Sequence, residues 1–112
     1  MPSIQWNVYI AEIGFIENNT SKLRPVIVIS EPVGDHNIVL AAPIYSVKYE
    51  HKLIGDIAIP DDYNDLGLVR PSTIRLHRIA SLSTSDLKEQ LGHAPAEIQK
   101  AAIVELKKLL DV

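Results

Sequence analysis

Two mainly apolar runs, at 25–30 and 37–42, constrain the fold of this chain most strongly. Both are short, rich in β-branched residues and bounded by turn-forming residues, a combination typical of strands buried inside a sheet. Pro25 opens the first run. Because proline lacks the N–H that a sheet ladder needs, we expect it only at the first position of its strand. The segment between the runs, 31–36, includes a proline and a glycine and predicts a turn.

Three further segments predict strands around this central pair. Residues 6–13 are rich in β-branched and aromatic side chains, and residues 55–59 alternate weakly. Residues 72–82 interleave polar and apolar side chains and predict one long strand. Between the first two strands, residues 14–23 predict a polar loop that is long for a hairpin, and long loops in small domains often carry function.

The last part of the chain switches to helical signals. Ser83 and Asp86 fit a capping pair, which predicts a short helix that ends at Gly92. From Pro95 onward, apolar residues recur at helical spacing and predict a C-terminal helix. Short strands followed by helices indicate an α+β fold: a small, strongly bent sheet or β-barrel whose one face the C-terminal helix covers, as one domain spanning residues 1–112.

Composition excludes several classes of site. The chain has no cysteine, which excludes disulfides, thiolate metal sites and a cysteine nucleophile. It has neither a membrane-length apolar run nor the start of a secretory signal, so we expect a cytoplasmic protein. A net charge of −3 argues against a generally basic nucleic-acid binder. Residues 66–85 nevertheless contain no acid and three arginines, Arg70, Arg75 and Arg78, so local phosphate binding is compatible with the sequence.

One of the four histidines stands out. The histidines share no metal-ligand spacing, which favours scattered surface positions. His77, however, lies two residues from Arg75 on the predicted strand, so both should point to the same side, with Thr73 beside them. The three residues are either the solvated face of a strand or a phosphodiester site. In such a site arginine neutralises phosphate oxygens and histidine exchanges a proton.

Two strand ends form a second candidate cluster. Lys22 and Arg24 precede one central strand, and Tyr45 and Ser46 follow the next. Arg24 either pairs with a carboxylate at the strand start or serves as a binding group where loop and sheet meet. Tyr45 and Ser46 either form a turn or supply hydroxyl groups to the same rim.

Several of these segments resemble one known family. Residues 22–30 resemble the K-x-R-P-V-V-V-I-S segment of the MazF/PemK family of toxin endoribonucleases, and residues 42–46 resemble its A-P-I-T-S. Residues 66–75 are similar to its G-L-x-x-P-S-x-V-R strand, and the first strand and the C-terminal segments also match in order. Arg24 and Arg75 match arginines of these motifs. The chain departs at Tyr45, where the family has threonine, and at His77, where some members have aspartate.

The resemblance implies an SH3-like barrel that forms a homodimer and pairs with an antitoxin protein. It also implies a cofactor-free and metal-independent endoribonuclease that is selective for sequences in single-stranded RNA. In that reaction the 2′-hydroxyl is the nucleophile, so the protein need supply only a base, an acid and charge stabilisation. The expected catalytic residues are Arg24, Arg75, His77 and Ser46, and the expected RNA-binding residues are Lys22, Tyr45, Thr73, Arg70 and Arg78.

Three other functions fit the same segments. A toxin of this architecture can act on gyrase by contact without catalysis. The departures at Tyr45 and His77 also leave room for an inactivated toxin or for an adaptor module with no toxicity.

Overall fold

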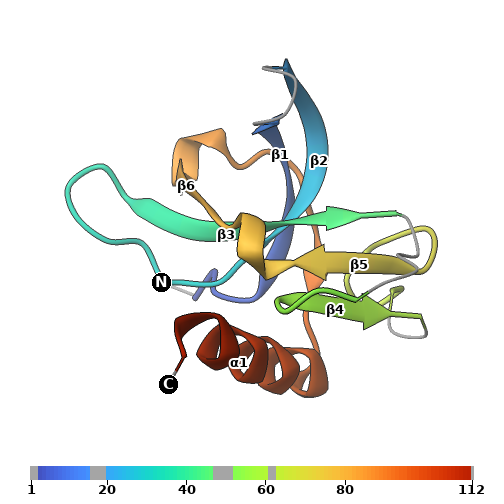
Figure 1. The fold of residues 1–112 in the computed structure, drawn as a ribbon. Helices are drawn as coiled ribbons and strands as arrows, with labels where there is room; N and C mark the ends of the chain where they lie inside the picture. The colour runs from blue at the N-terminus through green and yellow to red at the C-terminus, as the bar shows by residue number, and fades with distance from the viewer. Residues whose placement is uncertain (1–2, 16–19, 47–51, 61–62, 112) are drawn as a thin grey trace.

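A curved antiparallel sheet forms the body of the molecule, and one helix packs against it (Figure 1). The computed structural model describes residues 3–15, 20–46, 52–60 and 63–111. Within these ranges the chain forms β1 (Asn7–Phe15), β2 (Thr20–Val28), β3 (Ile38–Tyr45), β4 (Asp56–Ile59), β5 (Ser72–Arg75), the 3-10 turn η1 (Leu76–Arg78), β6 (Ala80–Ser83), the 3-10 turn η2 (Thr84–Asp86), β7 (Gln90–His93) and α1 (Ala96–Leu110). The strand order is β4-β5-β3-β2-β1-β7, and β6 also pairs with β3. The predicted α+β fold, with a bent sheet and a C-terminal helix, is confirmed.

Alternation along the strands gives the sheet two different faces. On one face, side chains such as Ile27, Ile44 and Ile74 pack with Ile98 and Ala102 of α1 in the larger core. On the opposite face, a smaller buried cluster contains Ala11, Ile13, Val26 and Ala41. Because successive strand residues point to opposite sides, Arg24 lies on the same side as Val26. We call this second side the Arg24 face.

Pro25 lies inside a strand, so the prediction that it opens one is wrong. β1 and β2 both extend into the segment for which the sequence predicts a loop, and Pro25 pairs with Ile10 in the middle of that ladder. The N–H of Ile29 donates to Leu40 in β3, so every second position of β2, including 25, directs its backbone toward β3. Pairing between β2 and β3 begins only at Val26. At position 25, β2 and β3 form no described backbone hydrogen bond, so the missing N–H of proline costs the sheet none there.

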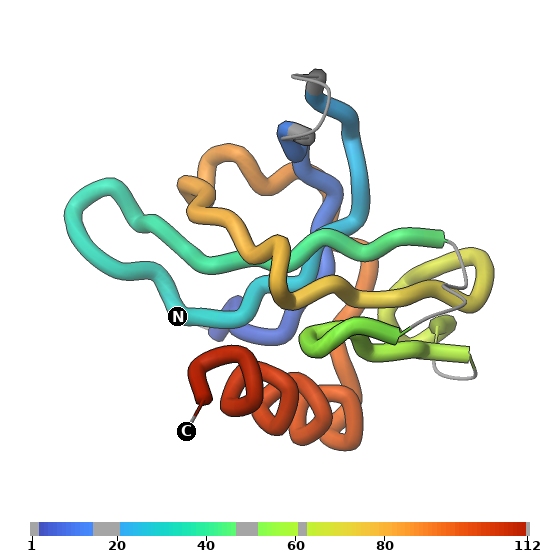
Figure 2. The backbone as a smooth tube through the Cα atoms, in the orientation of Figure 1, coloured from blue at the N-terminus to red at the C-terminus, as the bar shows by residue number. Residues whose placement is uncertain are grey.

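The predicted long strand 72–82 is also wrong, because a turn divides it into β5 and β6 (Figure 2). Both parts pair with β3, and the registers differ: Ile44 lies opposite Ile74, whereas Ala41 lies opposite Ala80. The chain absorbs the difference in the three residues of η1. His77 and Arg78 consequently lie on a turn, and strand alternation does not set their directions.

The helix predicted after Ser83 forms only one 3-10 turn. Its capping box is present, because the Ser83 hydroxyl accepts from the N–H of Ser85 and the Ser83 N–H donates to Asp86. The chain then joins the sheet: Lys88 donates to the carbonyl of Ile10, and β7 pairs with β1. Sheet pairing thus overrides a correct local capping signal, and α1 is the only α-helix among the described residues. None of the described helices is long and apolar enough to span a membrane.

Gly92 is the position where this unexpected strand is most sensitive to substitution. A Cβ atom there would lie 2.5 Å from the carbonyl carbon of Leu66 and 2.6 Å from the carbonyl oxygen of Asp65. Gly92→Ala should therefore lower the free energy of unfolding by about 1–3 kcal/mol, the usual cost of overpacking.

Denaturant unfolding measures this difference, and Gly34→Ala is the control. A Cβ at Gly34 would have no neighbour within 4 Å, so that variant should lose only about 1 kcal/mol through its left-handed backbone. Equal stability of Gly92→Ala and the wild type would contradict the close packing at β7.

Candidate functional site

Strand register places five of the predicted site residues on the Arg24 face. Lys22 and Arg24 lie on the same side of β2 as Val26 of the smaller core. Tyr45, at the end of β3, lies on the same side as Ala41. Thr73 lies directly opposite Tyr45 on β5, and Arg75 follows two residues later on the same side. Residues from three strands thus meet on the side of the sheet that α1 leaves uncovered.

Arg24 and Tyr45 are in direct contact. The guanidinium carbon of Arg24 lies 4.2 Å from the centre of the Tyr45 ring. A planar guanidinium over an aromatic face is a favourable cation–π geometry that also fixes the direction of the N–H groups. Tyr45 therefore helps to hold the Arg24 guanidinium in place.

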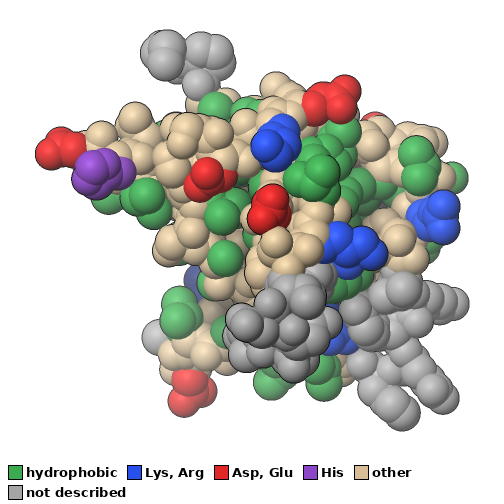
Figure 3. Space-filling view, turned by 90° about the horizontal axis from the view of Figure 1, so that it is seen from above, with side chains coloured by type: hydrophobic (Ala, Val, Ile, Leu, Met, Phe, Trp, Pro, Cys, Tyr) green, Lys and Arg blue, Asp and Glu red, His purple; other side chains and the backbone are tan. Residues whose placement is uncertain are grey.

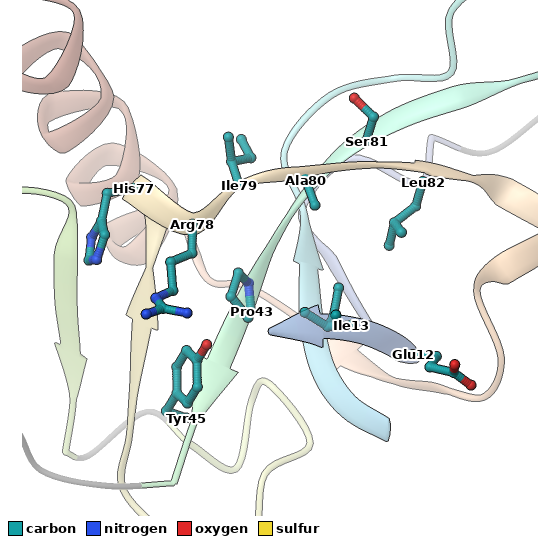
Figure 4. Close-up of a pocket in the computed structure, with 11 residues that line it drawn as sticks. Glu12, Ile13, Pro43, Tyr45, His77, Arg78, Ile79, Ala80, Ser81 and Leu82 are labelled. Carbon is teal, nitrogen blue, oxygen red and sulfur yellow. The ribbon is translucent and has the colours of Figure 1, made fainter. Parts of the chain in front are cut away.

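A hollow of about 580 Å³ opens beside this pair (Figure 4). One end is polar, and Figure 4 shows Arg78 between His77 and Tyr45 there. The other end is mainly apolar and is lined by Ile13, Pro43, Ile79, Ala80 and Leu82. The hollow can therefore hold an anionic group next to an apolar or planar one.

Ser46 and Tyr45 are consecutive, but their side chains line different hollows. Ser46, just after β3, lines a second hollow of about 410 Å³ with Arg70 and Ser72. Arg24 borders this hollow as well. The structure thus brings Arg24, Ser46 and Arg70 together in one place, and Tyr45, His77 and Arg78 in another.

Asp56 is the residue of this region that the sequence analysis missed. It lies opposite Arg75 in the β4–β5 ladder, and the residue is 1% exposed. Arg75 approaches both carboxylate oxygens, with Nη2 3.3 Å from Oδ2 and Nε 3.2 Å from Oδ1. An aspartate at the head of a strand that is otherwise apolar was the available signal, because a buried carboxylate requires a cation partner.

His77 reaches the same carboxylate from η1. Its Nδ1 atom lies 3.8 Å from Asp56 Oδ1, and its side chain is 25% exposed. The prediction that Arg75 and His77 are neighbours through strand alternation gives the wrong reason, since η1 interrupts the strand. Asp56 is what brings the two side chains together.

Lys and Arg side chains do not form one continuous basic patch on the face seen from above. Figure 3 shows them in separate places among hydrophobic and acidic side chains. This agrees with a net charge of −3. Among the described residues, no group of three or more His, Asp or Glu side chains is placed to hold a metal ion.

Residues 4–110 match the family described as PemK-like, MazF-like toxin of type II toxin-antitoxin system. The chain belongs to this family. Comparison with curated protein sequences gave no match.

Solved structures of this kind share the fold. The Mycobacterium tuberculosis toxin MazF-mt6 superposes with a TM-score of 0.73 at 21% identity, over 95% of this chain and 97% of that one. MazF from Deinococcus radiodurans gives a TM-score of 0.69 at 21% identity, over 99% and 97%. An endoribonuclease in complex with its cognate antitoxin, from a mycobacterial species, gives 0.73 at 14% identity, over 99% and 97%. The predicted membership of the MazF/PemK family is confirmed.

In this family member, α1 supports the turn beneath His77. The Glu105 carboxylate accepts a hydrogen bond of 3.1 Å from the N–H of Gly55, and Lys108 lies 2.8 Å from its other oxygen. The hydrogen bond with Lys108, and then that with Gly55, lowers the pKa of Glu105 below its ordinary value of 4.5. Gly55 has a φ of +98°, and a Cβ there would lie 3.2 Å from His77 Nδ1, so glycine lets the ring approach the backbone.

The lowered pKa of Glu105 predicts a pH-dependent contribution to stability. The ionised carboxylate favours the folded state, so its contribution is complete above pH 4.5 and is lost as the pH falls through the lower folded-state pKa. Glu105→Gln should cost about 1 kcal/mol at pH 7 and should reduce the loss of stability below pH 4.5.

Thermal unfolding between pH 3 and pH 7 measures this effect, with the exposed Glu89→Gln as control. An unchanged acid dependence in Glu105→Gln would show that the carboxylate does not stabilise the fold.

Proposed function

We propose that this toxin-family protein is an endoribonuclease that cuts single-stranded RNA at selected sequences without a metal ion. The observation that supports the proposal most directly is the group of Tyr45, His77 and Arg78 at the polar end of the larger hollow, with the Arg24 guanidinium stacked on the Tyr45 ring. Two guanidinium groups, an imidazole and a phenol meet the needs of phosphodiester transfer. Cations neutralise the phosphate, a titratable ring moves a proton, and an aromatic ring stacks on a splayed base.

The proposed reaction uses the 2′-hydroxyl of the RNA as nucleophile. Its oxygen bonds to the adjacent phosphorus while the bond from phosphorus to the 5′-oxygen of the next nucleotide breaks, which leaves a 2′,3′-cyclic phosphate and a 5′-hydroxyl. His77 removes the proton from the 2′-hydroxyl, and the leaving oxygen takes a proton from a group of the site or from water. Arg24 stabilises the negative charge that develops on the phosphorane oxygens.

The other predicted residues receive supporting roles in this proposal. Arg75, held by its ion pair with Asp56, adds positive charge near His77. Arg78 and the exposed Lys22 bind neighbouring phosphates, and Tyr45 or Ser46 positions the reacting group. Thr73 is buried opposite Tyr45, and Arg70 borders the second hollow, so they act through that ring and on a flanking nucleotide, respectively.

The proposal extends to partners and location. One similar structure is an endoribonuclease with its cognate antitoxin, and another is a MazE–MazF complex from Deinococcus radiodurans. We propose that this chain is likewise bound by a small antitoxin, which holds it inactive, and that it forms a symmetric homodimer in the cytoplasm. The apolar end of the larger hollow suits the apolar side chains of such a partner.

Incubation of the purified protein with a mixed RNA pool in EDTA tests the proposed activity. We expect discrete fragments that end in a cyclic phosphate, and Arg24→Ala should cut about 100–1,000-fold more slowly, as is typical for the loss of one charge-stabilising donor. Arg24→Lys should restore little, because lysine lacks the planar fork.

The matched control for Arg24→Lys is Arg78→Lys, which should weaken RNA binding more than turnover. Arg75→Lys is less informative, because it would also disturb the ion pair with Asp56. Intact RNA with the wild-type protein would contradict the proposal, and inhibition of gyrase by the same preparation would favour a contact toxin. Unchanged cleavage by a folded Arg24→Ala would remove Arg24 from the reaction.

A further inference from the structure

The inference concerns Asp56, whose carboxylate lies 3.8 Å from Nδ1 of His77. Its carboxylate is almost completely buried, and the N–H of Leu53 and Nη2 of Arg75 both donate to Oδ2. Oδ1 accepts no hydrogen bond from the described residues, although Arg75 Nε lies 3.2 Å away. The ion pair with Arg75 compensates the charge at Oδ1, but this oxygen can still accept a hydrogen bond from another donor that approaches it.

His77 Nδ1 is placed to be that donor. It lies 3.8 Å from Oδ1, about 1 Å beyond the length of a hydrogen bond to a carboxylate. A side chain at position 55 would obstruct this approach. Gly55 has none, so the ring has room against the backbone. Catalytic hydrogen bonds are often long in the absence of substrate and shorten when it binds.

We propose that Asp56 is a positioning residue for His77, and that Arg75 serves chiefly to hold the Asp56 carboxylate in place. In neutral His77 the proton then resides on Nδ1, which faces Asp56, and the lone pair on Nε2 is left to accept the proton of the 2′-hydroxyl. This inference rests on the proposed ribonuclease function for its chemistry, but the protonated nitrogen of His77 can be measured without RNA.

The charges around His77 support this assignment of the ring nitrogens. Asp56 from β4 is the nearest acid to His77. Arg75 and Arg78 precede and follow His77 in the sequence. Glu105 and Lys108 of α1 lie beyond Gly55. On the side of the hollow, Arg78 lies between the ring and Tyr45 (Figure 4). Asp56 is thus the group that can accept from Nδ1, since Arg75 and Arg78 only donate.

Nitrogen-15 NMR of the imidazole side chains tests the proposal directly, with the signals of His77 assigned from their loss in His77→Asn. At a pH where the ring is neutral, we expect the wild-type protein to carry the proton on Nδ1. Asp56→Asn should shift the population toward the Nε2–H form, which free histidine prefers. A wild-type ring protonated on Nε2 would overturn the proposal, and this result requires no variant to fold.

Cleavage kinetics separate positioning from a merely structural role. Asp56→Asn should lower kcat by about 100-fold, the usual effect of a displaced catalytic group, and leave KM within about threefold. The control is Asp35→Asn, an exposed aspartate in the turn before β3, which should match the wild type. Normal kcat in a folded Asp56→Asn would overturn the positioning role. If the wild-type protein cuts no RNA while His77 carries its proton on Nδ1, the proposed function fails and the Asp56–His77 pairing stands.

Discussion

The double pairing of β3 is the constraint on which the site depends. The C-terminal end of β3 pairs with β5, and the start of β3 pairs with β6. The two registers differ, so β5 and β6 cannot form one continuous strand. The chain resolves the conflict by forming η1 between them. That turn takes His77 and Arg78 out of the ladder and places both at the rim of the larger hollow. A mismatch in backbone hydrogen bonding thereby creates the place where side-chain chemistry becomes possible.

Charge burial then determines how the site can be used. Asp56 is buried in the sheet, and the cross-strand cation Arg75 compensates it. A guanidinium committed to a buried carboxylate is less available to an external phosphate than one at the surface. Arg24, stacked on Tyr45, and Arg78, at the rim, are therefore better placed to bind an external phosphate, such as that of the proposed RNA substrate. The protein can carry a net negative charge and still present cations at one local position.

The sequence predicts the parts of this fold that depend on local pattern. The apolar runs of β2 and β3, the C-terminal helix and the capping box at Ser83 are all recovered from hydrophobic periodicity and residue type. Register, however, is a property of strand pairs, so no local pattern indicates the break at η1 or the strand that replaces a helix around Gly92. For the same reason Asp56 was missed, because its partner Arg75 is distant in sequence and adjacent only across the β4–β5 ladder.

The pH dependence of RNA cleavage at saturating RNA, in the wild type and in His77→Asn, tests the central claim most directly. A rate that depends on a neutral His77 should rise with pH while the imidazole loses its proton and should then level. Asparagine has similar size and polarity but does not titrate, so His77→Asn should be about 100-fold slower or more and should lack the acidic limb. Normal turnover with an unchanged pH profile in His77→Asn would contradict the account and assign the proton transfer to another group.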